Sequence, residues 1–214
     1  MSVLNSGGFT YEAENTSNQL ETYEWDNTWW EKCNTPDVPR VLHIGDSISC
    51  GLRYSINLKA EDKIFFDNFG TSKALDNPLF APSLEIFHRQ QIRCDAVIFN
   101  NGLHGFHLND ETEYKDFYEK MILSLKEIFK DIPLALLLST TVKDEAQNQR
   151  VIARNKAVLE LGEKYSIPVI DMYSMSIKQT GEQFDGVHFN ICAYEAIAEE
   201  LIEAVKTAFP NLCK

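Results

Sequence analysis

The chain has 214 residues, which is the length of one large domain or of one domain with an appendage. Its 32 acidic residues outnumber its 20 basic residues, and the net charge of −12 argues against nucleic acid or an anionic membrane as a partner, because phosphate binding needs clustered Lys and Arg. Hydrophobic residues make up 44% of the chain, which is typical of a globular domain and excludes disorder throughout.

No apolar run approaches the roughly 18 residues of a membrane span. The first residues carry neither the basic flank nor the apolar stretch of a signal peptide, so we expect a cytoplasmic protein. The five cysteines form no CxxC pair. Their spacing favours reduced thiols over a zinc site, and we expect no metal.

Residues 1–36 differ in composition from the rest of the chain. This stretch is polar and then carries Trp25, Trp29 and Trp30 close together. We interpret it as an N-terminal extension that packs through its tryptophans on a catalytic domain formed by residues 37–214. The alternative is that the tryptophans form a platform on which sugar rings stack.

Strands and helices alternate from residue 38 onward. Short apolar segments predict five strands, at 38–45, 63–70, 95–102, 133–140 and 167–172. Helical patterns follow them, at 47–58, 84–92, 113–130, 144–165 and 191–208. This alternation predicts an α/β protein, a three-layer α/β/α sandwich around a five-stranded parallel sheet with the flavodoxin-like order 2-1-3-4-5.

Ligands of such sheets bind at the carboxyl ends of the strands, where the first strand leads into Ser47. Gly45 allows a tight turn there, and Ser47 falls at the start of a helix. A helix N-terminus favours developing negative charge, and its free N–H groups can donate to an oxyanion. The alternative is that Ser47 or Asp46 only caps the helix.

The next two strand ends carry further polar groups. Gly70 ends the second strand and can present its N–H without a side chain in the way, or it is an ordinary loop glycine. After the third strand, Asn100, Asn101 and His104 lie beside two glycines. These donors suit a charged or carbonyl ligand, and the alternative is a simple Asn-Gly turn.

Asp185 and His188 lie three residues apart just before the last helix. A carboxylate in this position can orient one imidazole nitrogen and leave the other free to act as a base, as in a nucleophilic triad. The alternative is an aspartate that caps and a histidine that is incidental.

Together these motifs resemble the SGNH (GDSL-like) hydrolase family over residues 38–208. The GDS at 45–47 resembles the nucleophile block of the family, the NFG at 68–70 its second block, and the DGVH at 185–188 its terminal block. The resemblance implies an α/β/α fold shared by esterases, lipases and carbohydrate deacetylases.

The resemblance also implies a role for each matching residue. Ser47 would be the nucleophile, His188 the base, and Asp185 the residue that orients it. The N–H groups of Ser47 and Gly70 would line the oxyanion hole.

One block departs from the family pattern, because His104 stands where the family commonly has an asparagine that donates to the oxyanion. Either His104 donates through a ring N–H, or Asn101 or Asn100 takes its place, or the hole is weakened. The loss of one such donor typically costs about 10²–10³ in rate.

The expected function is that of a serine esterase that forms an acyl-enzyme and needs no cofactor. We expect short acyl groups, acetyl above all, and as substrate a small ester or an acylated carbohydrate. Two alternatives stay open: a ligand-binding module of the same fold that is catalytically impaired, and an acyltransferase that uses the same triad. A flavin-binding protein is disfavoured, because the loop at 45–49 is too short and glycine-poor to wrap a phosphate.

Overall fold

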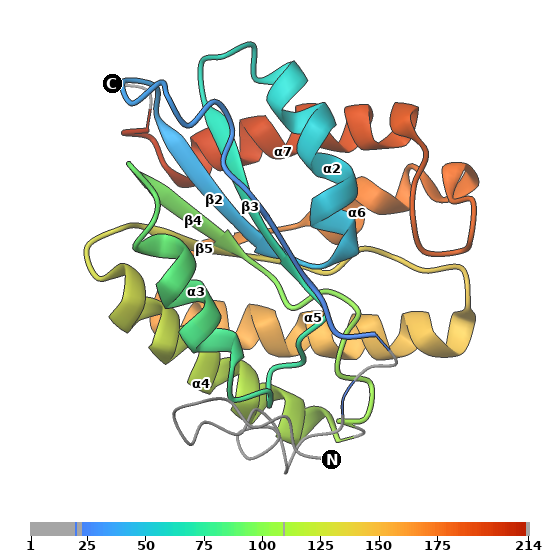
Figure 1. The fold of residues 1–214 in the computed structure, drawn as a ribbon. Helices are drawn as coiled ribbons and strands as arrows, with labels where there is room; N and C mark the ends of the chain where they lie inside the picture. Colours follow the sequence, from blue (N-terminus) through green and yellow to red (C-terminus); the bar gives the residue numbers. More distant parts are fainter. Residues whose placement is uncertain (1–19, 21–22, 109, 213–214) are drawn as a thin grey trace, which may run out of the picture.

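The computed structural model describes residues 20, 23–108 and 110–212, and it shows one sheet between two layers of helices (Figure 1). The strands are β1 (Asp26–Trp29), β2 (Arg40–Gly45), β3 (Phe65–Thr71), β4 (Ala96–Phe99), β5 (Leu134–Leu137) and β6 (Val169–Ile170). The helices are α2 (Ser47–Lys59), α3 (Phe80–His88), α4 (Glu111–Phe129), α5 (Glu145–Tyr165), α6 (Met172–Ile177) and α7 (Ile191–Ala208), with a short 3₁₀ turn at Thr180–Glu182. None of the described helices is long and apolar enough to cross a membrane.

The sheet has the order β1-β3-β2-β4-β5-β6. Strands β2 to β6 are parallel, and their order confirms the predicted 2-1-3-4-5 arrangement. The predicted number of five strands is wrong, because β1 adds a sixth strand that runs antiparallel to β3 at the sheet edge. Two helical predictions also need correction: α3 begins at Phe80 rather than at residue 84, and α6 forms between the last predicted strand and the helix at 191–208, where we predicted no helix.

Strands β2, β3 and β4 are buried on both faces of the sheet, which explains why the parallel strands appear in the sequence as nearly continuous apolar runs. Along β2, Val41 faces the layer of α2 and α7, while Leu42 and Ile44 face the layer of α3, α4 and α5. Figure 1 shows these two helical layers on opposite sides of the sheet. The parallel strands therefore form a rigid centre whose carboxyl ends can carry a site.

The segment before β2 is bound to the rest of the domain in two ways. Trp30 stacks on Phe87 of α3, with the ring centroids 4.6 Å apart. The buried guanidinium of Arg40 pairs with buried Asp67 at 2.8 Å and also donates to the carbonyl of Glu31. Residues 1–19, 21 and 22, which belong to the predicted extension, lie outside the described residues, and the boundary after residue 36 stays a prediction.

Candidate active site

Ser47 is the first residue of α2, directly after the turn that leaves β2. The helix is capped by Asp46, whose Oδ1 accepts the N–H of Ile48 at 2.9 Å. Because Asp46 does the capping, the hydroxyl of Ser47 is not used for it. Ser47 thus stands at the positive end of a thirteen-residue helix.

The structure brings Ser47, His188 and Asp185 together, although 141 residues separate the serine from the histidine. His188 Nε2 lies 2.8 Å from Ser47 Oγ, and His188 Nδ1 lies 2.6 Å from Asp185 Oδ2. An ionised carboxylate can only accept, so the proton of the imidazole belongs on Nδ1. Nε2 then accepts the hydroxyl proton of Ser47.

The carboxyl group of Asp185 is held in its charged form. Its Oδ1 accepts the backbone N–H groups of Val187 at 2.9 Å and of His188 at 2.7 Å. Desolvation acts to raise the pKa of this carboxyl, but the hydrogen bonds from the His188 ring and from these two backbone groups outweigh it and lower the pKa to about 2. Asp185 is therefore a carboxylate across the neutral range.

The turn that carries this pair is fixed by the neighbouring chain. Lys143 donates its backbone N–H to the carbonyl of Gly186 at 2.8 Å and its ammonium to the carbonyl of Gln183 at 2.6 Å. The ring of Phe184, which is 73% exposed, stacks on the ring of His188 with centroids 6.0 Å apart. Sequence reasoning did not single out Phe184, because an exposed phenylalanine gives no signal of its own.

Asp46 also connects the nucleophile turn to the loop that follows β4. Its Oδ2 accepts the N–H of Leu103 at 3.0 Å. Gly102 has a φ of +67°, and a Cβ on it would lie 1.9 Å from Asp46 Oδ2. Only glycine therefore fits at residue 102, and the loop that carries His104 begins directly against the turn that carries Ser47.

Gly70 does not take the place that we predicted for it. It lies inside β3, opposite Asn27 of β1, and not in a loop. Two residues later, the N–H of Ser72 donates to the carbonyl of Trp25 on the same β1 side. Because backbone groups alternate between the two neighbouring strands, the N–H of Gly70 also points to β1. The structure thus corrects the prediction that this N–H lines the oxyanion hole.

The missing side chain of Gly70 has a packing role instead. A Cβ at this residue would lie 2.2 Å from the sulfur of Cys50, which is on α2 one turn after Ser47. Glycine here allows the first turn of α2 to lie close against β3. The position of Ser47 depends on that close approach.

The two remaining oxyanion candidates lie in the chain after β4. Asn101 is buried, and its amide donates to the carbonyl of Lys73 at 3.1 Å, so it links the chain after β4 to the chain after β3. His104 lies in the loop that rests on Asp46, and its ring meets the ring of Trp25 edge-on with centroids 6.0 Å apart. Both side chains stay candidates for the oxyanion donor, because the Asn101 amide nitrogen carries a second hydrogen and His104 carries a ring N–H.

Arg154 of α5 binds backbone carbonyls of this loop. It is 2% exposed, and its guanidinium donates to the carbonyls of His104 at 3.1 Å, Gly105 at 2.7 Å and Leu108 at 3.1 Å. The guanidinium also lies over the ring of Tyr114, 4.3 Å from its centroid. Sequence reasoning missed this residue, because an arginine in an amphipathic helix is usually solvated.

These groups define what the arrangement can do. A serine hydroxyl at a helix N-terminus is hydrogen-bonded to an imidazole, which is in turn bonded to a carboxylate. Such a chain can remove the hydroxyl proton while the oxygen attacks a carbonyl carbon. Within the described ranges, no group of three or more His, Cys, Asp or Glu side chains could hold a metal ion.

No family model and no curated protein matches the sequence, but solved structures match the fold. A member of the lipolytic G-D-S-L family from Veillonella parvula has a TM-score of 0.63 and 15% identity, over 80% of this chain and 98% of that one. A GDSL-like lipase from Bacteroides thetaiotaomicron has a TM-score of 0.59 and 16% identity, over 93% of this chain and 97% of that one. An acetyl xylan esterase has a TM-score of 0.61 and 15% identity, over 78% of this chain and 99% of that one. The chain therefore has the fold of the GDSL-like hydrolases.

Proposed function

We propose that the protein is a serine esterase that hydrolyses esters of short acyl groups through an acyl-enzyme on Ser47. The observation that carries the proposal is the chain of two hydrogen bonds, 2.8 Å from Ser47 to His188 and 2.6 Å from His188 to Asp185. The fold supports it, because the solved proteins of this fold include a GDSL-like lipase and an acetyl xylan esterase.

The reaction proceeds in two steps. Ser47 Oγ attacks the ester carbonyl while His188 Nε2 takes its proton, and Asp185 stabilises the imidazolium that forms. The tetrahedral intermediate collapses, the acyl–oxygen bond of the ester breaks, and the alcohol leaves with the proton from His188. Water, activated by the same imidazole, then attacks the acyl-enzyme and releases the acid and the free Ser47.

The oxyanion of the intermediate needs donors at a helix N-terminus or in a neighbouring loop. The N–H of Ser47 has no partner within α2, because the first four N–H groups of a helix lack one. The second donor is a side chain of the segment after β4, either the ring N–H of His104 or the amide of Asn101. Each donor of this kind contributes roughly 10²–10³ to the rate.

The test is hydrolysis of p-nitrophenyl acetate, butyrate and octanoate by the wild type and by Ser47→Ala. We expect turnover that requires Ser47 and that falls as the acyl chain lengthens. Ser124→Ala is the matched control, because Ser124 lies on α4 on the other face of the sheet and only bonds the carbonyl of Lys120. This variant should keep full activity.

Two further readouts separate the proposal from its alternatives. A phosphonate ester probe should label the wild type at Ser47, and a failure to label would leave a binding module as the better description. An added alcohol should not capture the acyl group in preference to water. Preferred capture would instead identify an acyltransferase with the same triad.

A further inference from the structure

Three tryptophans lie within six residues at the edge of the sheet, and the structure gives each a different environment. Trp30 is stacked on Phe87 and its ring nitrogen is buried, so this tryptophan packs against the domain. Trp29 is covered on one face by Arg53, and its ring nitrogen donates to Glu31.

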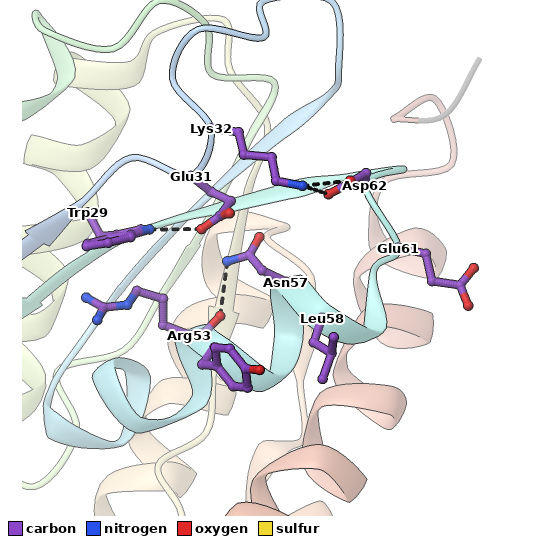
Figure 2. Close-up of a pocket in the computed structure, with 9 residues that line it drawn as sticks. Trp29, Glu31, Lys32, Arg53, Asn57, Leu58, Glu61 and Asp62 are labelled. Atoms are coloured by element: carbon purple, nitrogen blue, oxygen red, sulfur yellow. Dashed lines mark hydrogen bonds and ion pairs between the residues drawn. The ribbon is translucent and has the colours of Figure 1, made fainter.

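Trp29 also lines a pocket of about 490 Å³ between residues 29–32 and α2, shown in Figure 2. Polar groups of this pocket bind one another, as in the ion pair of Lys32 with Asp62 at 2.5 Å. Trp29 therefore already has polar and cationic partners from its own chain.

Trp25 is the tryptophan that lies beside the candidate active site. Strand β1 runs antiparallel to β3, so the residue before β1 meets the carboxyl end of β3, the end at which Ser47 also lies. There the ring of Trp25 meets the ring of His104 edge-on. The loop of His104 is bound in turn to Asp46, next to Ser47.

The backbone of Trp25, rather than burial of its ring, fixes its position. Its N–H donates to the hydroxyl of Ser72 at 2.8 Å, and its carbonyl accepts the N–H of Ser72 at 3.1 Å. The neighbouring Asp26 is paired with Lys73 at 2.6 Å. Trp25 is only partly buried, so the backbone bonds hold a residue that keeps an exposed part beside the loop of His104.

We propose that Trp25 determines substrate specificity by forming the wall against which a pyranose ring in the leaving alcohol stacks while Ser47 attacks its acyl ester. This inference rests on the esterase function proposed above. An indole face suits the apolar C–H face of a sugar ring, and the charges nearby, with Lys73 neutralised by Asp26, favour a neutral ligand over an anion. The acyl–oxygen bond is cleaved as above, and the sugar hydroxyl leaves with the proton from His188.

The test compares two acetyl esters of primary alcohols, methyl 6-O-acetylglucopyranoside and ethyl acetate, which differ in whether the leaving group has a ring. Trp25→Leu keeps apolar bulk against His104 but offers no aromatic face. We expect this variant to raise KM for the pyranoside by about tenfold, the size of one aromatic contact, and to leave kcat/KM for ethyl acetate nearly unchanged. Trp25→Phe should retain part of the preference.

Trp29→Leu is the matched control, because Trp29 lies at the far end of the same strand. This variant should leave KM and kcat/KM unchanged for both esters. Equal losses on both esters with Trp25→Leu would show that Trp25 only supports the structure, and no change on either would show that it does not contact the substrate. Thermal unfolding of each variant verifies that it is folded.

A binding experiment separates this inference from the esterase proposal. If the wild type hydrolyses neither ester in a Ser47-dependent way, the esterase proposal fails. Calorimetric titration of Ser47→Ala with methyl 6-O-acetylglucopyranoside then tests Trp25 alone. Adding Trp25→Leu should weaken binding about tenfold, whereas adding Trp29→Leu should not. Binding that is absent, or that Trp25→Leu leaves unchanged, would overturn the inference.

Discussion

Asp46 has two structural roles, one for each oxygen of its carboxylate. Oδ1 caps α2 through Ile48, and Oδ2 holds the chain after β4 through the N–H of Leu103. The residue is 1% exposed, so both bonds are shielded from water. A single carboxylate thereby sets the distance between the nucleophile turn and the loop that carries His104.

Replacing Asp185 by Asn tests the orienting role of the carboxylate. An amide can donate to Nδ1, which would move the imidazole proton to Nε2 and leave no base for Ser47. We expect kcat for p-nitrophenyl acetate to fall on the order of 10⁴, with KM nearly unchanged. Asp171→Asn, which affects only the cap of α6, is the control and should be active. Normal activity of Asp185→Asn would contradict the proposed triad.

Replacing Gly102 by Ala tests the contact between Asp46 and the loop. Its Cβ would lie 1.9 Å from Asp46 Oδ2, so the carboxylate must move and the loop with it. Gly105→Ala has a similar backbone strain, with φ +72° against +67°, but the nearest atom to its Cβ would be the Cβ of Ala74 at 3.0 Å. We expect Gly102→Ala to lose far more esterase activity than Gly105→Ala. Similar losses would mean that backbone strain alone is responsible.

At the scale of elements, the chain between β4 and α4 depends on side chains from α5. Arg154 donates to three carbonyls of this chain, and Arg150 donates to those of Phe106 and Leu108 at 3.0 and 2.8 Å. The two arginines differ in burial, since Arg154 is buried and Arg150 is partly exposed. A loop without regular secondary structure is thus held by a neighbouring helix.

Arg154→Met should destabilise the protein and displace the loop. The change removes a buried guanidinium from three carbonyls, of which those of Gly105 and Leu108 keep a second donor, so we expect a loss of about 1–3 kcal/mol in the free energy of unfolding. Arg150→Met should cost less, because water can replace a partly exposed guanidinium. Urea denaturation measures both values. An equal cost for the two variants would contradict the role of burial.

The sequence predicts the parallel part of this fold well, because each buried strand has a strong apolar signal and each is followed by a helix. It does not predict β1, because the four residues Asp26–Trp29 are all exposed and show no apolar alternation. The error on Gly70 follows from this miss. Without β1, Gly70 would end an edge strand with a free N–H, whereas pairing with β1 uses that group.

The candidate triad was predictable for a different reason. Ser47, Asp185 and His188 each lie at the end of a strongly patterned element or in a short motif, and the resemblance of these motifs to the GDSL-like hydrolases implies their roles. The groups around them were not predictable. The second bond of Asp46, the ring of Trp25 and the guanidinium of Arg154 act through contacts between segments about 50 to 80 residues apart, which no local pattern encodes.

At the scale of the whole molecule, one buried histidine couples the stability of the sheet to pH. His43 lies in the middle of β2, between β3 and β4, and is 2% exposed. Burial lowers the pKa of its imidazole to about 4, because the interior disfavours the charged form. Its ring nitrogen Nε2 has no hydrogen-bond partner among the described residues, so none of their side chains or backbone groups stabilises a proton on it.

The sign of the effect follows from where protons bind. In the unfolded chain an imidazole takes up a proton near pH 6.5, whereas in the folded protein His43 does so only near pH 4. The unfolded state therefore binds more protons in this window, and stability is lost as the pH falls from about 6.5 to 4. Above pH 6.5 the neutral ring has no such effect. The shift corresponds to a loss of about 3 kcal/mol across the window.

Urea denaturation of the wild type and of His43→Leu at several pH values between 7 and 4 isolates this contribution. Asp67, whose pKa is raised by burial, and Asp185, whose pKa is about 2, add their own pH dependence to both proteins. Their effects cancel in the difference between the two curves. As the pH falls from 6.5 to 4, we expect the free energy of unfolding of the wild type to drop by about 3 kcal/mol relative to that of His43→Leu. Above pH 6.5 the difference between the two proteins should be constant. A difference that does not change with pH would show that His43 is protonated equally in the folded and unfolded states.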